Sequence, residues 1–280
     1  ANKGYLTSAT DLADIEYTHP KYFFDKAIYD RRVYNGVGKA DPSVEIKFGP
    51  NIKDWPEMVS LTDNLLLKVA SVIHDPVTTT DELIPSGETS SYRSNPLGLA
   101  EFTLSRKDPE YVGRAKAIQA VEKVREAGEC MGKAFPEVKE VMHAIKEKFE
   151  DVCGSNTGVG STIYAVKPGD GSAREQAASC QKVLGGWANI AKEYATKRYR
   201  SNLINWGMLP FVIDKDFDFD NDDYVFIPGI KDAVKNKTEI IKAYVVNKDF
   251  AEIELRLGEL TDDERQIITD GCLINYYKYN

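Results

Sequence analysis

The fold of this chain is constrained most by a predicted strand that is followed by a glycine-rich turn and then directly by a helix. Residues 161–166 read Ser-Thr-Ile-Tyr-Ala-Val, which predicts a buried strand. Residues 169–175 follow as Gly-Asp-Gly-Ser-Ala-Arg-Glu, and apolar positions after them predict a helix that leads on to Ile190 and Tyr194. Because glycine permits the sharp turn that joins the two elements, the segment predicts an α/β unit.

The same turn predicts a small anion site. A helix that opens here would direct unpaired backbone N–H groups and the positive end of its dipole toward one volume. The guanidinium of Arg174 would point to the same place, and Ser172 would sit at its mouth. A carboxylate would bind there. From spacing alone, Ser172 could equally be no more than the cap of the helix.

Other segments predict a mixture of strands and helices without a regular strand–helix–strand alternation. Strands are expected at 65–73, 208–213, 224–227 and 240–246, helices at 109–127, after Pro136 and at 262–276, and a flexible loop at 154–160. Residues 1–58 are rich in Tyr, Asp, Lys, Pro and Gly, with one short strand at 44–48. This region predicts a long connector that leans on a partner surface, since loops of such length are uncommon inside a domain.

Composition excludes several classes of protein. The net charge is -8 and no dense block of Lys and Arg occurs, which argues against a nucleic-acid surface. No apolar stretch approaches the roughly 20 residues of a membrane helix. The four cysteines, Cys130, Cys153, Cys180 and Cys272, are scattered, so they predict neither a zinc nor an iron–sulfur site in this chain. Unpaired cysteines are typical of the reducing cytoplasm, where we expect the protein.

The acidic run at 214–223 resembles a calcium loop only superficially. Such a loop needs Gly at its sixth position and Glu at its twelfth. Counted from Asp214 these positions hold Phe219 and Val225. The run therefore predicts a solvated turn.

Four motifs in one order resemble the aconitase family. Residues 171–175 (Gly-Ser-Ala-Arg-Glu), with Ala-Ala at 177–178 and Leu-Gly-Gly at 184–186, are similar to the family signature. Residues 201–203 and 207–210 resemble its Asn-Leu and Gly-x-Leu-Pro steps, and residues 79–81 (Thr-Thr-Asp) with Gly87 and Arg93 resemble an upstream segment. Residues 271–276 resemble the end of the last helix.

The resemblance implies the C-terminal swivelling domain of an aconitase or isopropylmalate isomerase type of hydratase. That fold is α/β, a three-layer β/β/α domain of mixed sheets with flanking helices. The implied division is residues 1–60 as linker and tail of a preceding domain, and 61–280 as the swivelling domain. The opening residues read as if the chain starts in mid-protein. The family's [4Fe–4S] cluster would then be held by N-terminal domains of the same enzyme or by a large subunit, and this chain would bind none.

The resemblance also implies roles for individual residues. Ser172 matches the serine whose alkoxide removes a proton beside a carboxylate, and Asp81 matches an acidic residue that orients its neighbours. These two would be the catalytic residues. Arg93, Ala173 and Arg174 would bind a di- or tricarboxylate substrate. Arg93 would make a bidentate contact to a carboxylate, Arg174 would contact a carboxylate and supply positive charge, and Ala173 would offer its backbone N–H.

Several positions depart from the family pattern. Ala173 stands where the family has a second serine, Glu82 where it has His after Thr-Thr-Asp, and Gln176 where it has His after the Arg-Glu step. These departures leave the substrate open. Two alternatives also stay open: a separate small subunit of an isopropylmalate isomerase type of enzyme, and a non-catalytic carboxylate- or RNA-binding module on this fold.

Overall fold

The computed structural model describes residues 4–8, 11, 16–32, 36–45 and 47–279, which fall into two units, residues 1–47 and 48–280. In the first unit the described residues form one helix, α1 (Lys26–Arg32), which buries none of its side chains. The strand expected at 44–48 is wrong at Val44, Glu45, Lys47 and Phe48, which are irregular, and Ile46 lies outside the described residues.

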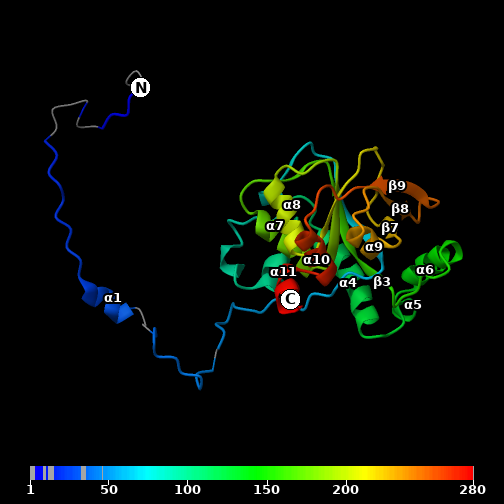
Figure 1. Ribbon diagram of the computed structural model, residues 1–280, viewed down its shortest axis with the longest axis horizontal. Helices are drawn as coiled ribbons and strands as arrows, with labels where there is room; N and C mark the ends of the chain where they lie inside the picture. Colours follow the sequence, from blue (N-terminus) through cyan, green and yellow to red (C-terminus); the bar gives the residue numbers. More distant parts are fainter. Residues whose placement is uncertain (1–3, 9–10, 12–15, 33–35, 46, 280) are drawn as a thin grey trace. The chain divides into compact units, whose positions relative to one another are not determined.

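A seven-stranded mixed sheet forms the centre of the second unit (Figure 1). Its spatial order is β6-β5-β3-β1-β7-β8-β9. The strands are β1 (Asn64–Ile73), β3 (Thr157–Ala165), β5 (Gly186–Ala191), β6 (Leu209–Val212), β7 (Tyr224–Ile227), β8 (Ile241–Val245) and β9 (Ala251–Leu255). The α/β class expected from the sequence is confirmed.

One half of the sheet is parallel and the other antiparallel. Strands β1, β3, β5 and β6 run parallel, and they are joined by crossovers that contain helices. Strands β7, β8 and β9 form an antiparallel meander that begins against β1. The strand runs are buried on both faces, which is typical of a parallel sheet covered on both sides.

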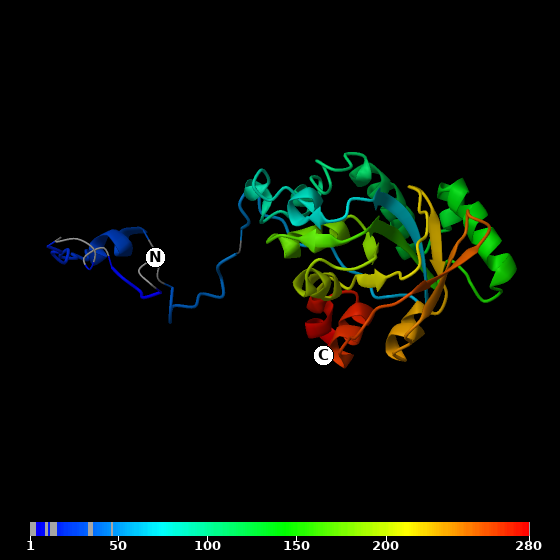
Figure 2. The ribbon, with the colours of Figure 1, turned by 90° about the horizontal axis from the view of Figure 1, so that it is seen from above.

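Alternate residues of the central strand enter different cores. Leu65, Leu67 and Val69 of β1 pack into the core that includes residues of α9 (Ile230–Lys235) and α10 (Asp262–Asp270). Leu66 packs on the opposite face with α4 (Tyr111–Glu126) and α6 (Pro136–Lys148). Ala70 packs into a third core with residues of α7 (Arg174–Val183) and α8 (Lys197–Asn205). Both views show α6 at the opposite end of this unit from α7 and α8 (Figures 1 and 2).

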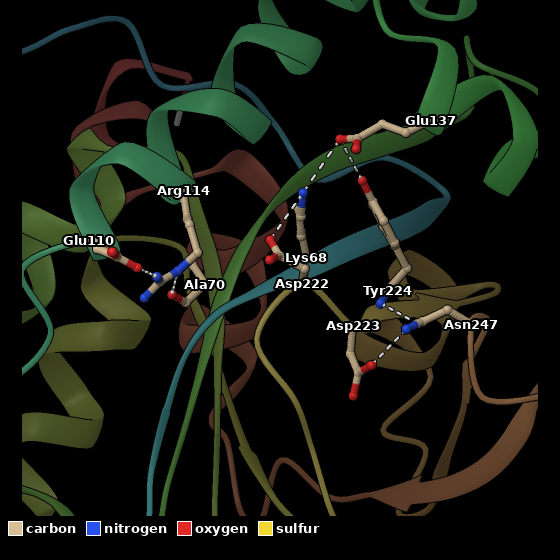
Figure 3. A network of polar contacts seen from close by, with 9 residues as sticks. All are labelled: Lys68, Ala70, Glu110, Arg114, Glu137, Asp222, Asp223, Tyr224 and Asn247. Carbon is tan, nitrogen blue, oxygen red and sulfur yellow. Dashed lines mark hydrogen bonds and ion pairs between the residues drawn. The ribbon is translucent and has the colours of Figure 1, made fainter.

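A polar network ties α6, which follows the short helix α5 (Met131–Ala134), to the sheet (Figure 3). Lys68 of β1 contacts Glu137 at 3.4 Å and Asp222 at 3.2 Å. The hydroxyl of Tyr224 donates to the same Glu137 at 3.1 Å. Because Lys68 is only 12% exposed, its ion pairs are better shielded than those of an open surface.

Most of the predicted helices and strands of the second unit are confirmed, and three predictions for this unit are corrected. The strands at 65–73, 208–213, 224–227 and 240–246 and the helices after 109 and 136 are present with small changes in their ends. The helix predicted to lead on from 174 to 194 is wrong beyond Val183, because the glycine pair after Leu184 ends α7 and β5 begins at Gly186.

Two further predictions, a loop and a helix, are corrected. The loop expected at 154–160 is wrong over its second half, because residues 157–160 are buried in β3. The single helix expected at 262–276 is broken at Gly271, whose φ is +97°, into α10 and α11 (Leu273–Tyr279). A Cβ at Gly271 would lie 2.0 Å from the carbonyl oxygen of Val59, so this close approach requires glycine.

The acidic run is a solvated turn with one exception. Asp214, Asp216, Asp218, Asp220 and Asp222 are exposed, whereas Asp223 is buried and accepts from the side chain of Asn247 at 2.7 Å. Among the described residues no helix is long and apolar enough to cross a membrane.

Candidate functional site

Two strand-to-helix turns lie side by side and position the candidate residues. The short strands β2 (Thr78–Thr79) and β4 (Pro168–Asp170) pair in parallel, with Thr79 opposite Asp170. Each strand leads directly into a helix: β2 into α2 (Thr80–Leu83), and β4, through the glycine turn, into α7. Two motifs that are about 90 residues apart in the sequence thus meet at one edge of the fold.

Glycine is required where these turns touch their neighbours. Gly171 has a φ of +135°, and a Cβ there would lie 2.2 Å from Oγ1 of Thr80. Gly169 has a φ of +96°, and a Cβ there would lie 2.2 Å from the ring of Tyr199. Tyr199 is itself fixed, since its hydroxyl accepts from Gln181 at 3.0 Å and from Asn189 at 2.9 Å. The turn before Ser172 is therefore held tightly against both flanking helices.

The N-terminus of α7 has no side-chain cap. The capping position is occupied by Ala173, which has no side chain able to accept from the first turn. Ser172 is exposed, and among the described residues its hydroxyl has no hydrogen-bond partner. The alternative in which Ser172 is only a helix cap is therefore not observed, and the first N–H groups of α7 are left for another acceptor.

Arg174 is a half-buried cation at the start of the same helix. Its Nε is buried and has no hydrogen-bond partner, and no ion pair joins it to the carboxylates described in the chain. A buried donor without an acceptor is costly, so its presence favours a ligand that supplies one.

Asp81 lies on the neighbouring turn, in the first turn of α2. Its carboxylate forms an ion pair with Arg106, which also contacts Glu88 at 2.5 Å. Both acidic partners raise the pKa of Arg106, with Glu88 the larger cause. Asp81 is thus held in place by a cation, as an orienting residue should be.

Glu82, which replaces a histidine of the family pattern, has a structural role here. Its carboxylate accepts from the backbone N–H of Thr79 at 2.7 Å and from the Thr79 hydroxyl at 2.8 Å, which completes a capping box. Partial burial raises the pKa of Glu82, but these bonds and the Lys107 ammonium outweigh it, so the pKa is lowered overall. Glu82 is therefore an ionised capping residue of α2.

Arg93 lies at the flank of α7 rather than at its N-terminus. It follows the short 3-10 helix η2 (Ser90–Tyr92) and lines a cavity of about 40 Å³ with Glu175, Gln176 and Ser179. Arg93 is exposed, and no ion pair joins it to another described residue. Glu175, beside it, instead accepts from the indole of Trp206 at 3.0 Å.

The structure thus brings Ser172, Ala173, Arg174 and Asp81 to adjacent turns, with Arg93 against the side of α7. Arg106 and Lys107, which hold Asp81 and Glu82, were not predicted. No sequence signal could have indicated them, because they lie about 25 residues from their partners with no regular spacing.

Part of this chain is similar to a known protein family. The family described as the aconitase C-terminal domain matches residues 146–216, a segment that includes Ser172, Ala173 and Arg174. Over this segment the chain is similar to the aconitase C-terminal domain. The resemblance noted in the sequence is confirmed at this level.

Two relatives accompany the family match. Aconitate hydratase A of Rickettsia bellii (strain RML369-C) is 32% identical over 132 residues, which cover 44% of this chain and 15% of that protein. The chain therefore spans a small part of this curated relative. A 3-isopropylmalate dehydratase from Methanocaldococcus jannaschii has 22% identity and a TM-score of 0.47 over 77% of this chain and 93% of that one. The matched segment includes the N-terminus of α7 and the strand before it, whereas Asp81 and Arg93 lie outside it.

Proposed function

We propose that this chain is the part of an aconitase-like hydro-lyase that supplies the serine base and the carboxylate-binding arginines. The observation that carries this proposal is the uncapped N-terminus of α7, where Ser172 and the unpartnered Arg174 meet inside the segment matched by the family. The reaction would remove water from, and add it to, a hydroxy di- or tricarboxylic acid.

In the proposed mechanism Ser172 removes the proton beside a substrate carboxylate. A serine hydroxyl is a poor base in water, so its alkoxide needs preorganised donors, each worth about 3–4 kcal/mol. The N–H groups of the first turn of α7 and the Arg174 guanidinium are the donors nearest in sequence to Ser172. Arg174 and Arg93 would bind substrate carboxylates, and Ala173 would contribute its backbone N–H. Asp81, held by Arg106 on the adjacent turn, would orient its neighbours.

The described residues do not fit an iron–sulfur cluster. They contain no group of three or more His, Cys, Asp and Glu side chains able to hold a metal ion. Cys130 and Cys153 are exposed, and Cys180 and Cys272 are buried apart from them. We therefore place the [4Fe–4S] cluster on other domains of the enzyme, or on a large subunit, and derive no step through it. A cytoplasmic location, expected from the free thiols, stays a prediction.

The substrate is proposed only as a class. Because Ala173 replaces a serine, this position offers substrate no side-chain hydroxyl. Glu82 and Gln176 replace two histidines, and Glu82 is engaged by Thr79. We propose a small hydroxy di- or tricarboxylate without committing to citrate and isocitrate.

The experiment is hydration of cis-aconitate by the protein with its cluster-binding domains present and the cluster reconstituted. We expect Ser172→Ala to lower kcat by about 10²–10⁴-fold, the range that a positioned base contributes. The matched control is Ser155→Ala, an exposed serine in the loop that precedes β3. Activity that Ser172→Ala leaves unchanged would refute the base assignment. Loss of activity in both variants would point to a general effect on the fold.

A further inference from the structure

A buried lysine without an acceptor lies outside the proposed active site. Lys182, in the last turn of α7, is 6% exposed, and its Nζ has no hydrogen-bond partner. Buried ammonium groups are normally paired, because removing the charge from water is expensive. This one therefore calls for an explanation.

The lysine is held against an aromatic ring. Its Nζ lies 3.9 Å from the centroid of the Trp187 ring, in cation–π contact. The nearest buried carboxylate, Glu122, is already engaged, since it contacts Arg125 twice at 2.7 Å and accepts from the N–H of Val159 at 2.8 Å. The ammonium group therefore contacts the Trp187 ring, and no carboxylate of the described residues forms a hydrogen bond with it.

A cavity of about 140 Å³ adjoins this lysine. Its walls come from residues 56–59, Leu97, α4, the end of α7 with the turn after it, and the start of β5. The charged side chains that line it besides Lys182 are Glu57, Glu122, Lys123 and Glu126. It shares Leu97, Gln119, Lys123 and Val183 with a second hollow of about 260 Å³ along α4.

This cavity is separate from the Ser172 site. Lys182 and Arg174 lie at opposite ends of α7, eight residues apart, which is about 12 Å along a helix. Its lining includes none of Ser172, Arg174, Asp81 and Arg93.

We propose that Lys182 forms a Schiff base with a small aldehyde that enters the cavity between α4 and β5. Lysines desolvated in apolar pockets are the ones that act as amine nucleophiles toward carbonyl groups. Burial lowers the pKa of Lys182 from 10.5 to about 8, partly offset by Cys272, Glu122 and Glu126. About 10% of an amine with that pKa is neutral at pH 7, against roughly 0.04% of an ordinary lysine.

The reaction balances without a further reactant. The lone pair of the neutral Nζ attacks the aldehyde carbon and a C–N bond forms. The carbonyl oxygen takes both amine hydrogens and leaves as water, so a C=N bond remains. Glu126 lines the cavity, and burial, followed by the charge of Glu122, raises the pKa of its carboxyl group. In this reaction the Glu126 carboxylate, in the wall of the same cavity, would take a proton from the amine and return it to the leaving oxygen.

The test is reductive trapping of the folded full chain with propionaldehyde and sodium cyanoborohydride, followed by peptide mapping of each labelled lysine. Lys123, an exposed lysine in the wall of the same cavity, is the internal comparison. We expect Lys182 to be labelled faster than Lys123 at pH 7, with a rate that levels off above about pH 8. A Lys182 that stays unlabelled, or is labelled no faster than Lys123, would overturn the proposal.

Two further measurements keep the result independent of folding defects. Lys182→Arg retains a cation over Trp187 but cannot form an imine, so it should lose only the fast label. For the wild type, a bulky aldehyde should label Lys123 but not Lys182, because the cavity is small. Equal labelling of both lysines by the bulky aldehyde would show that the cavity does not select the reactant, which also contradicts the proposal.

Discussion

At the scale of single residues, the turn before α7 requires glycine at position 171, where the side chain is a single hydrogen atom. Gly171→Ala would place a methyl group 2.2 Å from Oγ1 of Thr80 at a φ of +135°. We expect a loss of about 1–3 kcal/mol in the free energy of unfolding and a marked fall in hydratase activity, since the two turns must separate. Urea denaturation checks the first effect.

The control is Gly87→Ala. Gly87 has an unstrained φ, and no atom lies within 4 Å of a Cβ built there. Gly87→Ala should change stability by no more than a few tenths of a kcal/mol. If both variants behave alike, close approach is not the reason for glycine at 171.

The burial of Lys182 leads to a second prediction for a single residue, which concerns how stability depends on pH. Its pKa is about 8 in the folded chain, below the unfolded value, so the unfolded state binds the proton more tightly. The ammonium therefore destabilises the fold below about pH 8, and this penalty fades as the pH rises toward 10.5. The shift corresponds to about 3 kcal/mol, and a replacement of Lys182 also loses the contact with Trp187, worth about 1–2 kcal/mol.

Replacement by methionine, which keeps an unbranched apolar chain, removes the penalty. We expect Lys182→Met to be more stable than wild type by about 1–2 kcal/mol at pH 7, and the difference to shrink between pH 8 and 10. Parallel urea titrations at these pH values measure it. A difference that does not vary with pH would show that Lys182 is not protonated in the fold at neutral pH.

At the scale of secondary-structure elements, two capping boxes offer a matched pair. Thr79 caps α2 and Thr261 caps α10, and each accepts from a glutamate three residues on that bonds back to it. Removing either hydroxyl should cost about 1 kcal/mol of stability. Only Thr79→Ala should also lower kcat/KM, because α2 carries Asp81.

This comparison separates stability from function. Chemical denaturation and steady-state kinetics are measured on Thr79→Ala and Thr261→Ala together. An equal fall in kcat/KM for both would mean that α2 does not position the reacting groups.

The elements that could be predicted were those with strong local signals. The strand at 65–73 and the helix after Pro136 were recognised because their apolar residues follow one periodicity. Strand β5 was missed, since Trp187, Ala188 and Ile190 continue a pattern that also fits the helix before it. The glycine pair at 185–186 separates helix α7 from strand β5, and the first of the two glycines has a φ of +84°.

The candidate site was only half accessible to sequence reasoning. Ser172 and Arg174 belong to one short motif, so their proximity follows from the chain itself. The pairing of β2 with β4, which brings Asp81 beside them, is a long-range contact that local patterns do not encode. The same holds for Lys182, which has no partner that a pattern could reveal.

At the scale of the whole molecule, the three hydrophobic cores are all built from residues of the second unit. They begin no earlier than Met58, and the described side chains of residues 1–47 are almost all exposed, including Tyr17, Tyr22, Phe23 and Phe24. A chain of residues 48–280 should therefore fold by itself. Its melting temperature should equal that of the full chain, because burial of apolar surface supplies most of the stability.

The boundary expected from the sequence, between residues 60 and 61, can be tested against this one. A chain that starts at residue 61 loses Trp55, which packs on Trp206 with ring centroids 4.4 Å apart. It also loses the Met58 carbonyl, which accepts a hydrogen bond from the side chain of Asn275 at 2.8 Å. The buried amide of Asn275 would then have fewer hydrogen-bond partners. We expect the truncation at 61 to lower the melting temperature by several degrees and the truncation at 48 to leave it unchanged. Scanning calorimetry of the three chains decides the question, because equal melting temperatures for all three would place residues 48–60 with the connector rather than with the domain.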